Sequence, residues 1–173
     1  SCLNEKGVES LLEDVSIVYN APVRKPDLYL IALGVSQYAD AAMNLRYAAQ
    51  DATDVAALFS GHTDRYGQVH VQQLTNEQVT RAQVAALKTW LQQSKVDDQV
   101  IVFIAGHGLI DAQLDYYLAT HDVDFNQPAA RGLPYDAVDE LLDGIPARQK
   151  LILLDACHSG EIDKEGVTLV QEK

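Results

Sequence analysis

Two short apolar runs constrain the fold of this chain more than any other feature of its sequence. Residues 100–105 (VIVFIA) lead into His107, and residues 151–154 (LILL) lead into Cys157, 50 positions further on. Short runs rich in Val and Ile are typical of strands buried on both faces of a parallel sheet. Ligands of such sheets gather just beyond the carboxyl ends of the strands. The two runs are therefore expected to bring a histidine and a cysteine to one edge of a sheet.

Apolar patterns predict that strands and helices alternate along most of the chain. Strands are expected at 28–35, 69–74, 100–105, 116–119 and 150–155, and helices at 8–18, 45–59, 80–93 and 134–142. This alternation predicts an α/β fold, a three-layer α/β/α sandwich around a mostly parallel central sheet with right-handed crossovers. The last expected strand, 150–155, is the one that leads into Cys157. A sheet that ends on this strand suggests further strands C-terminal to this sequence.

The sequence divides into one expected domain and two flanking segments. Residues 27–160 carry the strand and helix patterns and form the one expected folded domain. Residues 1–26, with Pro22 and Pro26, are expected to be an extension or a linker from an upstream region. Residues 161–173 have mixed polarity and are expected to be a linker.

Composition narrows the function classes. A length of 173 residues suits one domain, and the net charge of −12 argues against nucleic acid or an anionic membrane as the main partner. The same charge could serve only to keep the protein in solution. Two cysteines, Cys2 and Cys157, form no disulfide framework, and no apolar run is long enough to span a membrane. We expect a cytoplasmic protein.

A cysteine and a histidine at one sheet edge suggest nucleophilic catalysis. A cysteine that cleaves a peptide bond must react as a thiolate, and a nearby imidazole such as His107 can remove the proton from Cys157. Gly108 is expected in a sharp turn after the histidine. The backbone N–H groups of Gly108 and Cys157 are candidate oxyanion donors, each typically worth about 3 kcal/mol. No third catalytic side chain is evident, so the sequence predicts a His–Cys dyad.

Other interpretations of His107 and Cys157 stay open. A single histidine at a strand end is often structural, and a lone buried cysteine behaves as a small hydrophobic residue. A metal site could use His107, Asp155, Cys157 and His158. The adjacency of Cys157 and His158 argues against such a site, because neighbouring side chains diverge and metal-ligand spacings usually skip residues.

Four separated segments resemble one family in the same order. The motifs FIAGHG and, 50 residues later, DACHSG resemble the caspase-like cysteine peptidases, and most closely metacaspases and bacterial caspase-like proteins. The segments ALGVSQY and NLRYAAQDATDVAALF are also similar to the beginning of that family. The resemblance covers about residues 27–160. It implies a caspase-like fold, a large-subunit portion, His107 as base and Cys157 as nucleophile.

The resemblance also implies a substrate preference. True caspases carry a glutamine two positions before the cysteine, whereas this chain has Asp155. In metacaspases an aspartate at that place and one in the first helix, here Asp51, form an acidic pocket for Arg or Lys at P1. Two carboxylates in a narrow slot suit a guanidinium or ammonium group. Arg46 could neutralise that slot, and Asp51 could instead be an ordinary solvated helix charge.

Calcium is the one cofactor that the resemblance raises. Several metacaspases bind Ca²⁺ through aspartates, and Asp122 lies at a matching offset from His107. The other positions match only in part, through Asp136, Asp139 and Asp163. Because Ca²⁺ needs six or more oxygen ligands, we expect no metal and no cofactor.

The expected partners follow from the resemblance. They are a protein or peptide substrate with a basic P1 residue, a C-terminal small subunit of the same precursor, and an upstream sensor or repeat domain. Lys173 would suit self-cleavage, although an arbitrary end of the sequence explains it nearly as well. A different class of function is a catalytically idle domain of the same fold that scaffolds a signalling complex.

Overall fold

A six-stranded mixed sheet forms the centre of the molecule. The computed structural model describes residues 5–9, 14–18, 24–62 and 64–158, with side chains through residue 156. The strand order is β2-β1-β3-β4-β5, and β6 pairs with the other side of β3. The strands are β1 (Leu28–Gly34), β2 (Val69–Thr75), β3 (Gln99–Ile110), β4 (Tyr116–Leu118), β5 (Leu133–Pro134) and β6 (Gln149–His158).

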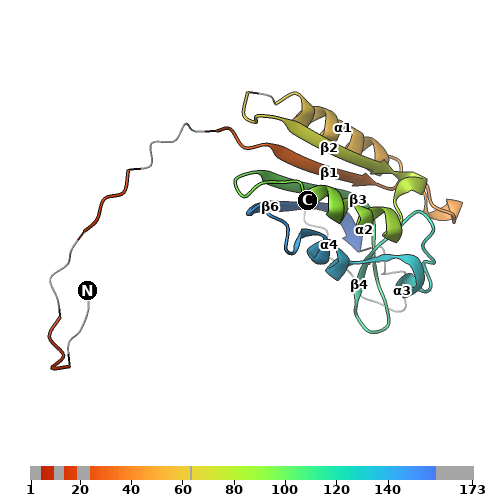
Figure 1. The fold of residues 1–173 in the computed structure, drawn as a ribbon. Helices are drawn as coiled ribbons and strands as arrows, with labels where there is room; N and C mark the ends of the chain where they lie inside the picture. Colours follow the sequence, from red (N-terminus) through yellow and green to blue (C-terminus); the bar gives the residue numbers. More distant parts are fainter. Residues whose placement is uncertain (1–4, 10–13, 19–23, 63, 159–173) are drawn as a thin grey trace, which may run out of the picture.

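Helices cover both faces of this sheet (Figure 1). Helix α1 packs on one face, over β1, β2 and β3, while α2 and α4 lie together on the other. The helices are α1 (Ala48–Ser60), α2 (Arg81–Leu91), α3 (Pro128–Arg131) and α4 (Tyr135–Leu142), with 3-10 turns at η1 (Ala41–Met43) and η2 (Asn76–Gln78). The predicted three-layer α/β fold is thus confirmed.

Strand β1 explains why the sheet carries two cores. All seven of its residues are buried. Because side chains alternate along a strand, Leu28, Leu30 and Ala32 join the cluster beneath α1, whereas Tyr29 and Ile31 join the cluster on the opposite face. An uninterrupted apolar run is what a strand covered on both sides requires.

The pairing changes direction along β3. Strands β1, β2, β3 and β6 run parallel, as predicted, whereas β4 and β5 pair antiparallel. Strand β3 continues to Ile110, because β4 pairs with residues 108–110 beyond the point where β1 has ended. The prediction of a sharp turn at Gly108 was therefore wrong.

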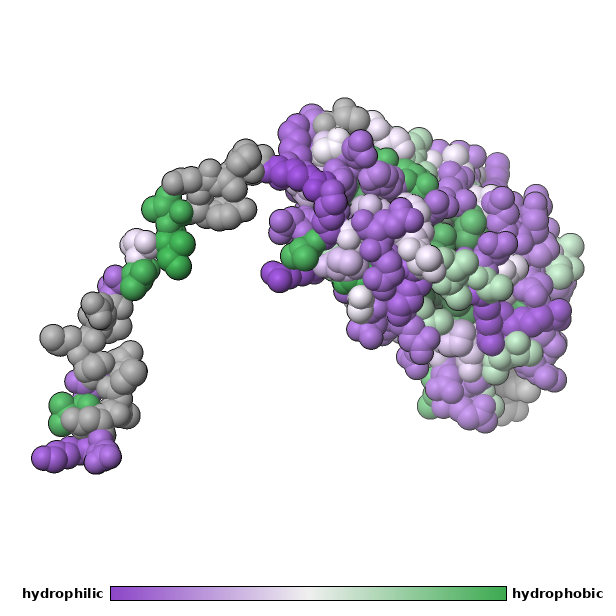
Figure 2. Space-filling view, in the orientation of Figure 1, coloured by the Kyte–Doolittle hydropathy of each residue, from purple (hydrophilic) through white to green (hydrophobic). Residues whose placement is uncertain are grey.

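The N-terminal residues form no helix where the structure describes them. Residues 14–18 are extended, and the side chains of Val15, Ile17 and Val18 are 81%, 89% and 76% exposed. Figure 2 shows apolar residues along this extended stretch. The helix predicted at 8–18 was wrong at these positions, because an apolar stripe stabilises a short helix only when it packs against a core.

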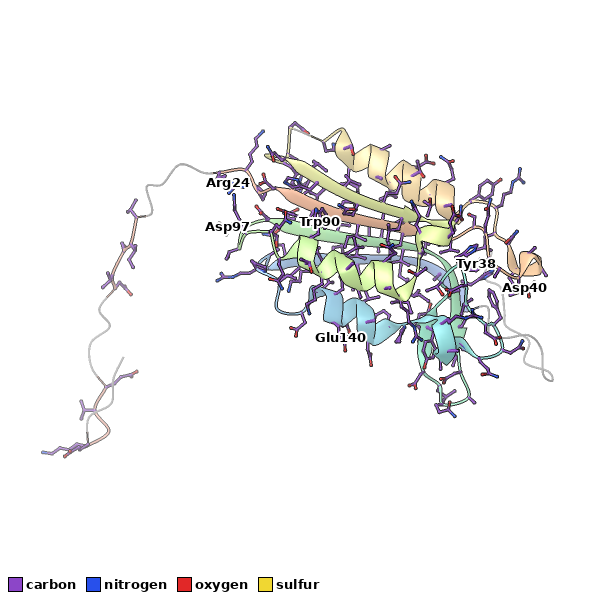
Figure 3. All side chains as sticks on the ribbon, turned by 45° about the vertical axis from the view of Figure 1, so that its right-hand side comes forward. Arg24, Tyr38, Asp40, Trp90, Asp97 and Glu140 are labelled. Atoms are coloured by element: carbon purple, nitrogen blue, oxygen red, sulfur yellow. The ribbon has the colours of Figure 1, made fainter. Side chains whose placement is uncertain are left out.

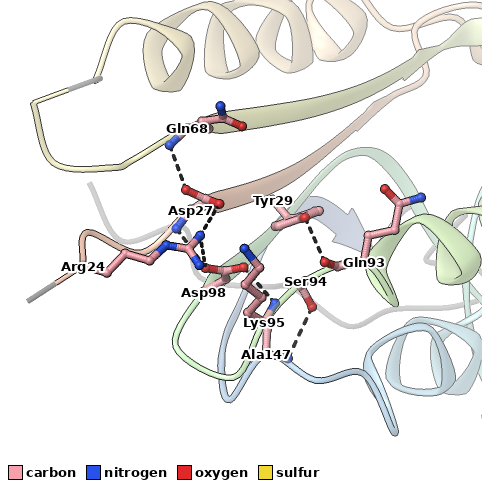
Figure 4. Close-up of polar contacts among 9 residues, drawn as sticks. All are labelled: Arg24, Asp27, Tyr29, Gln68, Gln93, Ser94, Lys95, Asp98 and Ala147. Carbon is pink, nitrogen blue, oxygen red and sulfur yellow. Dashed lines mark hydrogen bonds and ion pairs between the residues drawn. The ribbon is translucent and has the colours of Figure 1, made fainter. Parts of the chain in front are cut away.

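The amino ends of the strands are joined through two aspartates (Figure 4). Asp98 is 2% exposed, and its carboxylate accepts hydrogen bonds from the backbone N–H groups of Asp27 (3.0 Å) and Lys95 (2.7 Å). Asp27 in turn pairs with Arg24 at 2.6 Å and accepts from the N–H of Gln68. These bonds fix the end of the sheet opposite to His107.

Among the described residues, no helix has the length and apolar character needed to cross a bilayer.

Candidate active site

His107 and Cys157 occupy directly paired positions on adjacent parallel strands. The register of β3 and β6 aligns His107 with Cys157, and the alignment continues to Gly108 and His158. Neighbouring strands lie about 4.8 Å apart, and paired residues of parallel strands direct their side chains to the same face. The side chain of Cys157 itself lies outside the described residues. The fold therefore brings together the two backbone positions that the sequence singled out.

The imidazole of His107 is anchored by a backbone carbonyl. Its Nε2 atom lies 2.9 Å from the carbonyl oxygen of Met43, in the turn η1. A carbonyl oxygen only accepts hydrogen bonds, so Nε2 carries the proton in this contact. The neutral ring then presents Nδ1 as its unprotonated nitrogen, which is the form that a general base requires.

Two aromatic rings surround this imidazole. The ring centroid of Tyr38 lies 5.2 Å from that of His107, and the Phe125 ring stands edge-on at 5.7 Å. The hydroxyl of Tyr38 also accepts a hydrogen bond from the backbone N–H of His107 at 3.1 Å. Burial raises the pKa of Tyr38 to about 12, although the hydrogen bond from His107 opposes this shift.

The segment that carries Tyr38 and Met43 is fixed by two asparagines. Asn76 accepts hydrogen bonds from the backbone N–H groups of Ser36 (2.9 Å) and Gln37 (3.0 Å) through one side-chain oxygen. Asn44 accepts from the N–H of Tyr38 at 2.8 Å. Asn76 has a φ of +49°, a conformation that asparagine tolerates better than most residues.

Gly108 lies in β3 with its N–H on the side of β6. The carbonyl of His107 accepts from the N–H of Ala119, so it faces β4. Backbone groups of successive strand residues point to opposite sides, and the N–H of Gly108 consequently faces the strand of Cys157. A Cβ at position 108 would overlap the ring of Tyr116, so a larger residue there would require that side chain to move.

The two aspartates expected to bind a basic side chain lie on one face of the sheet. Gly34, Ala105 and Asp155 are aligned across β1, β3 and β6. The first turn of α1, which contains the half-buried Asp51, packs over Gly34. Asp155 is exposed, and the small side chain of Ala105 lies between it and the helix. The small residues of this row let the first turn of α1 approach the sheet closely.

Arg46 is engaged elsewhere. Its guanidinium lies 5.0 Å from the ring centroid of Tyr47, and the ion pairs found among the described residues do not include it. An exposed cation–π contact of this kind is worth about 0.5–1 kcal/mol. In this arrangement Arg46 does not neutralise Asp51.

The described residues contain no cluster of three or more His, Cys, Asp or Glu side chains suited to a metal ion. Asp122 accepts a hydrogen bond from the hydroxyl of Thr120 at 3.0 Å. Asp163, one of the positions considered for calcium, lies outside the described residues, as do 161–173 and the proposed processing site at Lys173.

Sequence reasoning missed Tyr38, Met43 and Phe125. Met43 acts through its backbone carbonyl, which every residue has, so no sequence signal could identify it. Tyr38 lies within the segment ALGVSQY that resembled the beginning of the caspase-like family, and this position was the one available signal.

Comparisons with known proteins agree with this fold. A crystal structure of protein GSU0716 from Geobacter sulfurreducens matches with a TM-score of 0.61 and 24% sequence identity. The match covers 79% of this chain and 53% of that one, so the chain spans about half the length of this structural neighbour. No curated protein matched. The family model described as "Caspase domain" matches residues 29–173, nearly the whole sequence. The chain therefore belongs to the caspase-domain family.

Proposed function

We propose that this chain carries the reacting residues of a cysteine endopeptidase, with His107 and Cys157 as its dyad. The observation that carries the proposal is the direct pairing of these two positions on β3 and β6. The contact between His107 and the Met43 carbonyl supports it, because this contact leaves Nδ1 available to take a proton.

The reaction proceeds in two stages. Nδ1 of His107 takes the thiol proton of Cys157, and the thiolate forms a bond to the carbonyl carbon of the scissile peptide. In this proposal the N–H groups of Gly108 and Cys157 stabilise the resulting oxyanion, which requires the Gly108 N–H to leave its pairing with β6. The imidazolium then protonates the leaving amine as the C–N bond breaks, which produces a thioester. His107 next takes a proton from water, the resulting hydroxide attacks the thioester, and the returned proton regenerates the thiol.

The proposed substrates have Arg or Lys at P1. Asp51 and Asp155 lie on the face of the sheet that α1 covers, and Arg46 stacks on Tyr47 rather than pairing with a carboxylate. A charge-assisted hydrogen bond to a carboxylate is worth roughly 1.5–3 kcal/mol, so each aspartate would contribute about ten- to hundredfold to kcat/KM.

The first test uses the full-length gene product and fluorogenic peptides with Arg, Lys or Asp at P1, with and without calcium. Hydrolysis of the Arg and Lys peptides is expected, with complete loss in Cys157→Ala and His107→Ala. A full-length protein that hydrolyses none of the peptides would favour the idle scaffold. Cleavage after Asp alone would contradict the acidic pocket.

The second test addresses the pocket. Asp155→Asn is expected to lower kcat/KM for P1 Arg peptides by about ten- to hundredfold, by loss of one charged partner. Asp54→Asn is the matched control, because Asp54 is an exposed residue of α1 whose carboxylate bonds Gln50. Equal activity of the two variants would show that Asp155 does not bind the P1 side chain.

Self-processing at a basic residue is the remaining part of the proposal. The full-length gene product of Cys157→Ala is expected to stay uncleaved where the native protein is cut. An identical fragment pattern in both proteins, read by mass spectrometry, would exclude self-processing.

A further inference from the structure

Tyr38 contacts His107 at both its backbone and its ring. The hydroxyl of Tyr38 accepts a hydrogen bond from the His107 N–H at 3.1 Å, and the two rings lie 5.2 Å apart at an angle of 37°. Tyr38 is only 5% exposed. Figure 3 places it at the end of the sheet opposite to Arg24 and Asp97.

Gly106 gives the hydroxyl of Tyr38 access to the backbone of β3. A Cβ at position 106 would lie 3.1 Å from the hydroxyl oxygen of Tyr38, closer than nearly all real Cβ contacts. A larger residue at this position would require the Tyr38 hydroxyl to shift by a few tenths of an ångström from its present place beside the His107 N–H. The absence of a side chain at Gly106 leaves the space that the hydroxyl of Tyr38 occupies.

Tyr38 is itself held in place from three sides. Its N–H donates to the Asn44 side chain at 2.8 Å, and the next N–H, of Ala39, donates to the carbonyl of His121 at 2.9 Å. The Phe125 ring stands edge-on to the Tyr38 ring at 5.3 Å and 75°. A side chain fixed in this way can serve as a rigid support for its neighbour.

We propose that Tyr38 is a positioning residue for His107, and this proposal rests on the dyad proposed above. Tyr38 fixes the backbone of the histidine, while the Met43 carbonyl fixes the far nitrogen of its ring. The Tyr38 hydroxyl and the Met43 carbonyl belong to one short segment, so a shift of that segment moves both contacts with His107 together. A displacement of a reacting group by about 1 Å can reduce a rate about a hundredfold, which makes such a support valuable.

The test compares Tyr38→Phe with Tyr29→Phe in the full chain. Both variants lose one hydroxyl from a buried tyrosine, but the hydroxyl of Tyr29 bonds the Gln93 carbonyl, far from His107. The first readout is the rate at which iodoacetamide alkylates Cys157. Trypsin places Cys2 and Cys157 in different peptides, so mass spectrometry reports the two thiols separately.

Tyr38→Phe is expected to slow alkylation of Cys157 by about three- to thirtyfold, whereas Tyr29→Phe leaves it unchanged. In the full-length gene product, kcat for a P1 Arg peptide should fall by a similar factor while KM stays within about twofold. A general loss of folded protein would instead lower the thermal midpoint.

Two outcomes would overturn the proposal, and they are distinguishable. If His107→Ala slows alkylation but Tyr38→Phe matches Tyr29→Phe, the dyad stands and Tyr38 has no positioning role. If His107→Ala leaves alkylation unchanged, the dyad itself is wrong, and the role of Tyr38 fails with it.

Discussion

A tyrosine that is buried beside a histidine becomes a poorer acid. Burial raises the pKa of Tyr38 to about 12, from a value of 10.0 in the unfolded chain. Below pH 10 the hydroxyl is neutral in both states, and it contributes no pH dependence to stability. Between pH 10 and pH 12 the unfolded chain loses this proton first, so the free energy of unfolding falls as the pH rises.

This shift gives a prediction for alkaline stability. At pH 11 the native protein should have lost about 1.4 kcal/mol through Tyr38, and Tyr38→Phe should lose none of this amount. Urea unfolding of both proteins at pH 8 and pH 11 measures the difference. If the stability difference between the two proteins is the same at both pH values, Tyr38 does not titrate as described.

The pairing of His107 and Cys157, the proposed reacting residues, could be predicted from the sequence, but the surroundings of His107 could not. His107 and Cys157 each follow an apolar run, and runs of this kind imply a shared sheet edge. The Met43 carbonyl and the Tyr38 hydroxyl reach His107 across 64 and 69 sequence positions. Such contacts depend on the exact path of the loop after β1, which apolar periodicity does not encode.

Helix α1 approaches strand β1 unusually closely. A Cβ at Gly34 would overlap the carbonyl of Ala48 and lie 2.7 Å from the Cβ of Ala52. The contact holds the first turn of α1, and with it Asp51, over the carboxyl end of the sheet. Gly34 therefore sets the distance between the sheet and Asp51, one of the two proposed pocket residues.

Gly34→Ala is accordingly expected to destabilise the protein by about 1–3 kcal/mol, because the helix must move outward. Gly61→Ala, at the other end of α1, is the control, since a Cβ there would meet only the Leu58 carbonyl at 3.5 Å. Denaturant unfolding compares the two variants. Equal stability would mean that the helix adjusts without cost.

The start of α2 was predicted correctly because a periodic pattern coincided with a cap. Thr80 accepts from the N–H of Gln83 and begins α2, as its sequence indicates. Helix α1 begins later than the predicted 45–59, because residues 41–43 form a 3-10 turn and the Asn44 side chain bonds Tyr38 instead of capping a helix. The pattern at 8–18 lacked a core to pack against, which periodicity alone cannot reveal.

Hydrogen bonds link neighbouring segments of the chain at both ends of the sheet. His107 and its supports lie at the carboxyl ends of the parallel strands, while Asp27 and Asp98 join the amino ends (Figure 4). Asp98 is buried, and it accepts from the backbone N–H of Asp27, just before β1, and from that of Lys95, in the turn before β3. Its contribution is to stability rather than to chemistry.

Asp98→Ala is expected to lower the free energy of unfolding by about 2–4 kcal/mol, because two buried donors lose their acceptor. Asp97→Ala, which removes the adjacent exposed carboxylate, should change it by no more than about 0.5 kcal/mol. Chemical denaturation distinguishes the two. A small effect for both variants would mean that water replaces the carboxylate of Asp98.

Strand β3 is paired on both sides, by β1 and then β4 on one side and by β6 on the other. Its amide hydrogens should therefore be among the slowest to exchange with solvent, because exposing them requires separation of the central strands. His107 belongs to this strand, whereas Asp51 belongs to a helix that can open separately. As the molecule begins to open, Asp51, one of the two proposed pocket residues, would lose its position before His107, the proposed base, does.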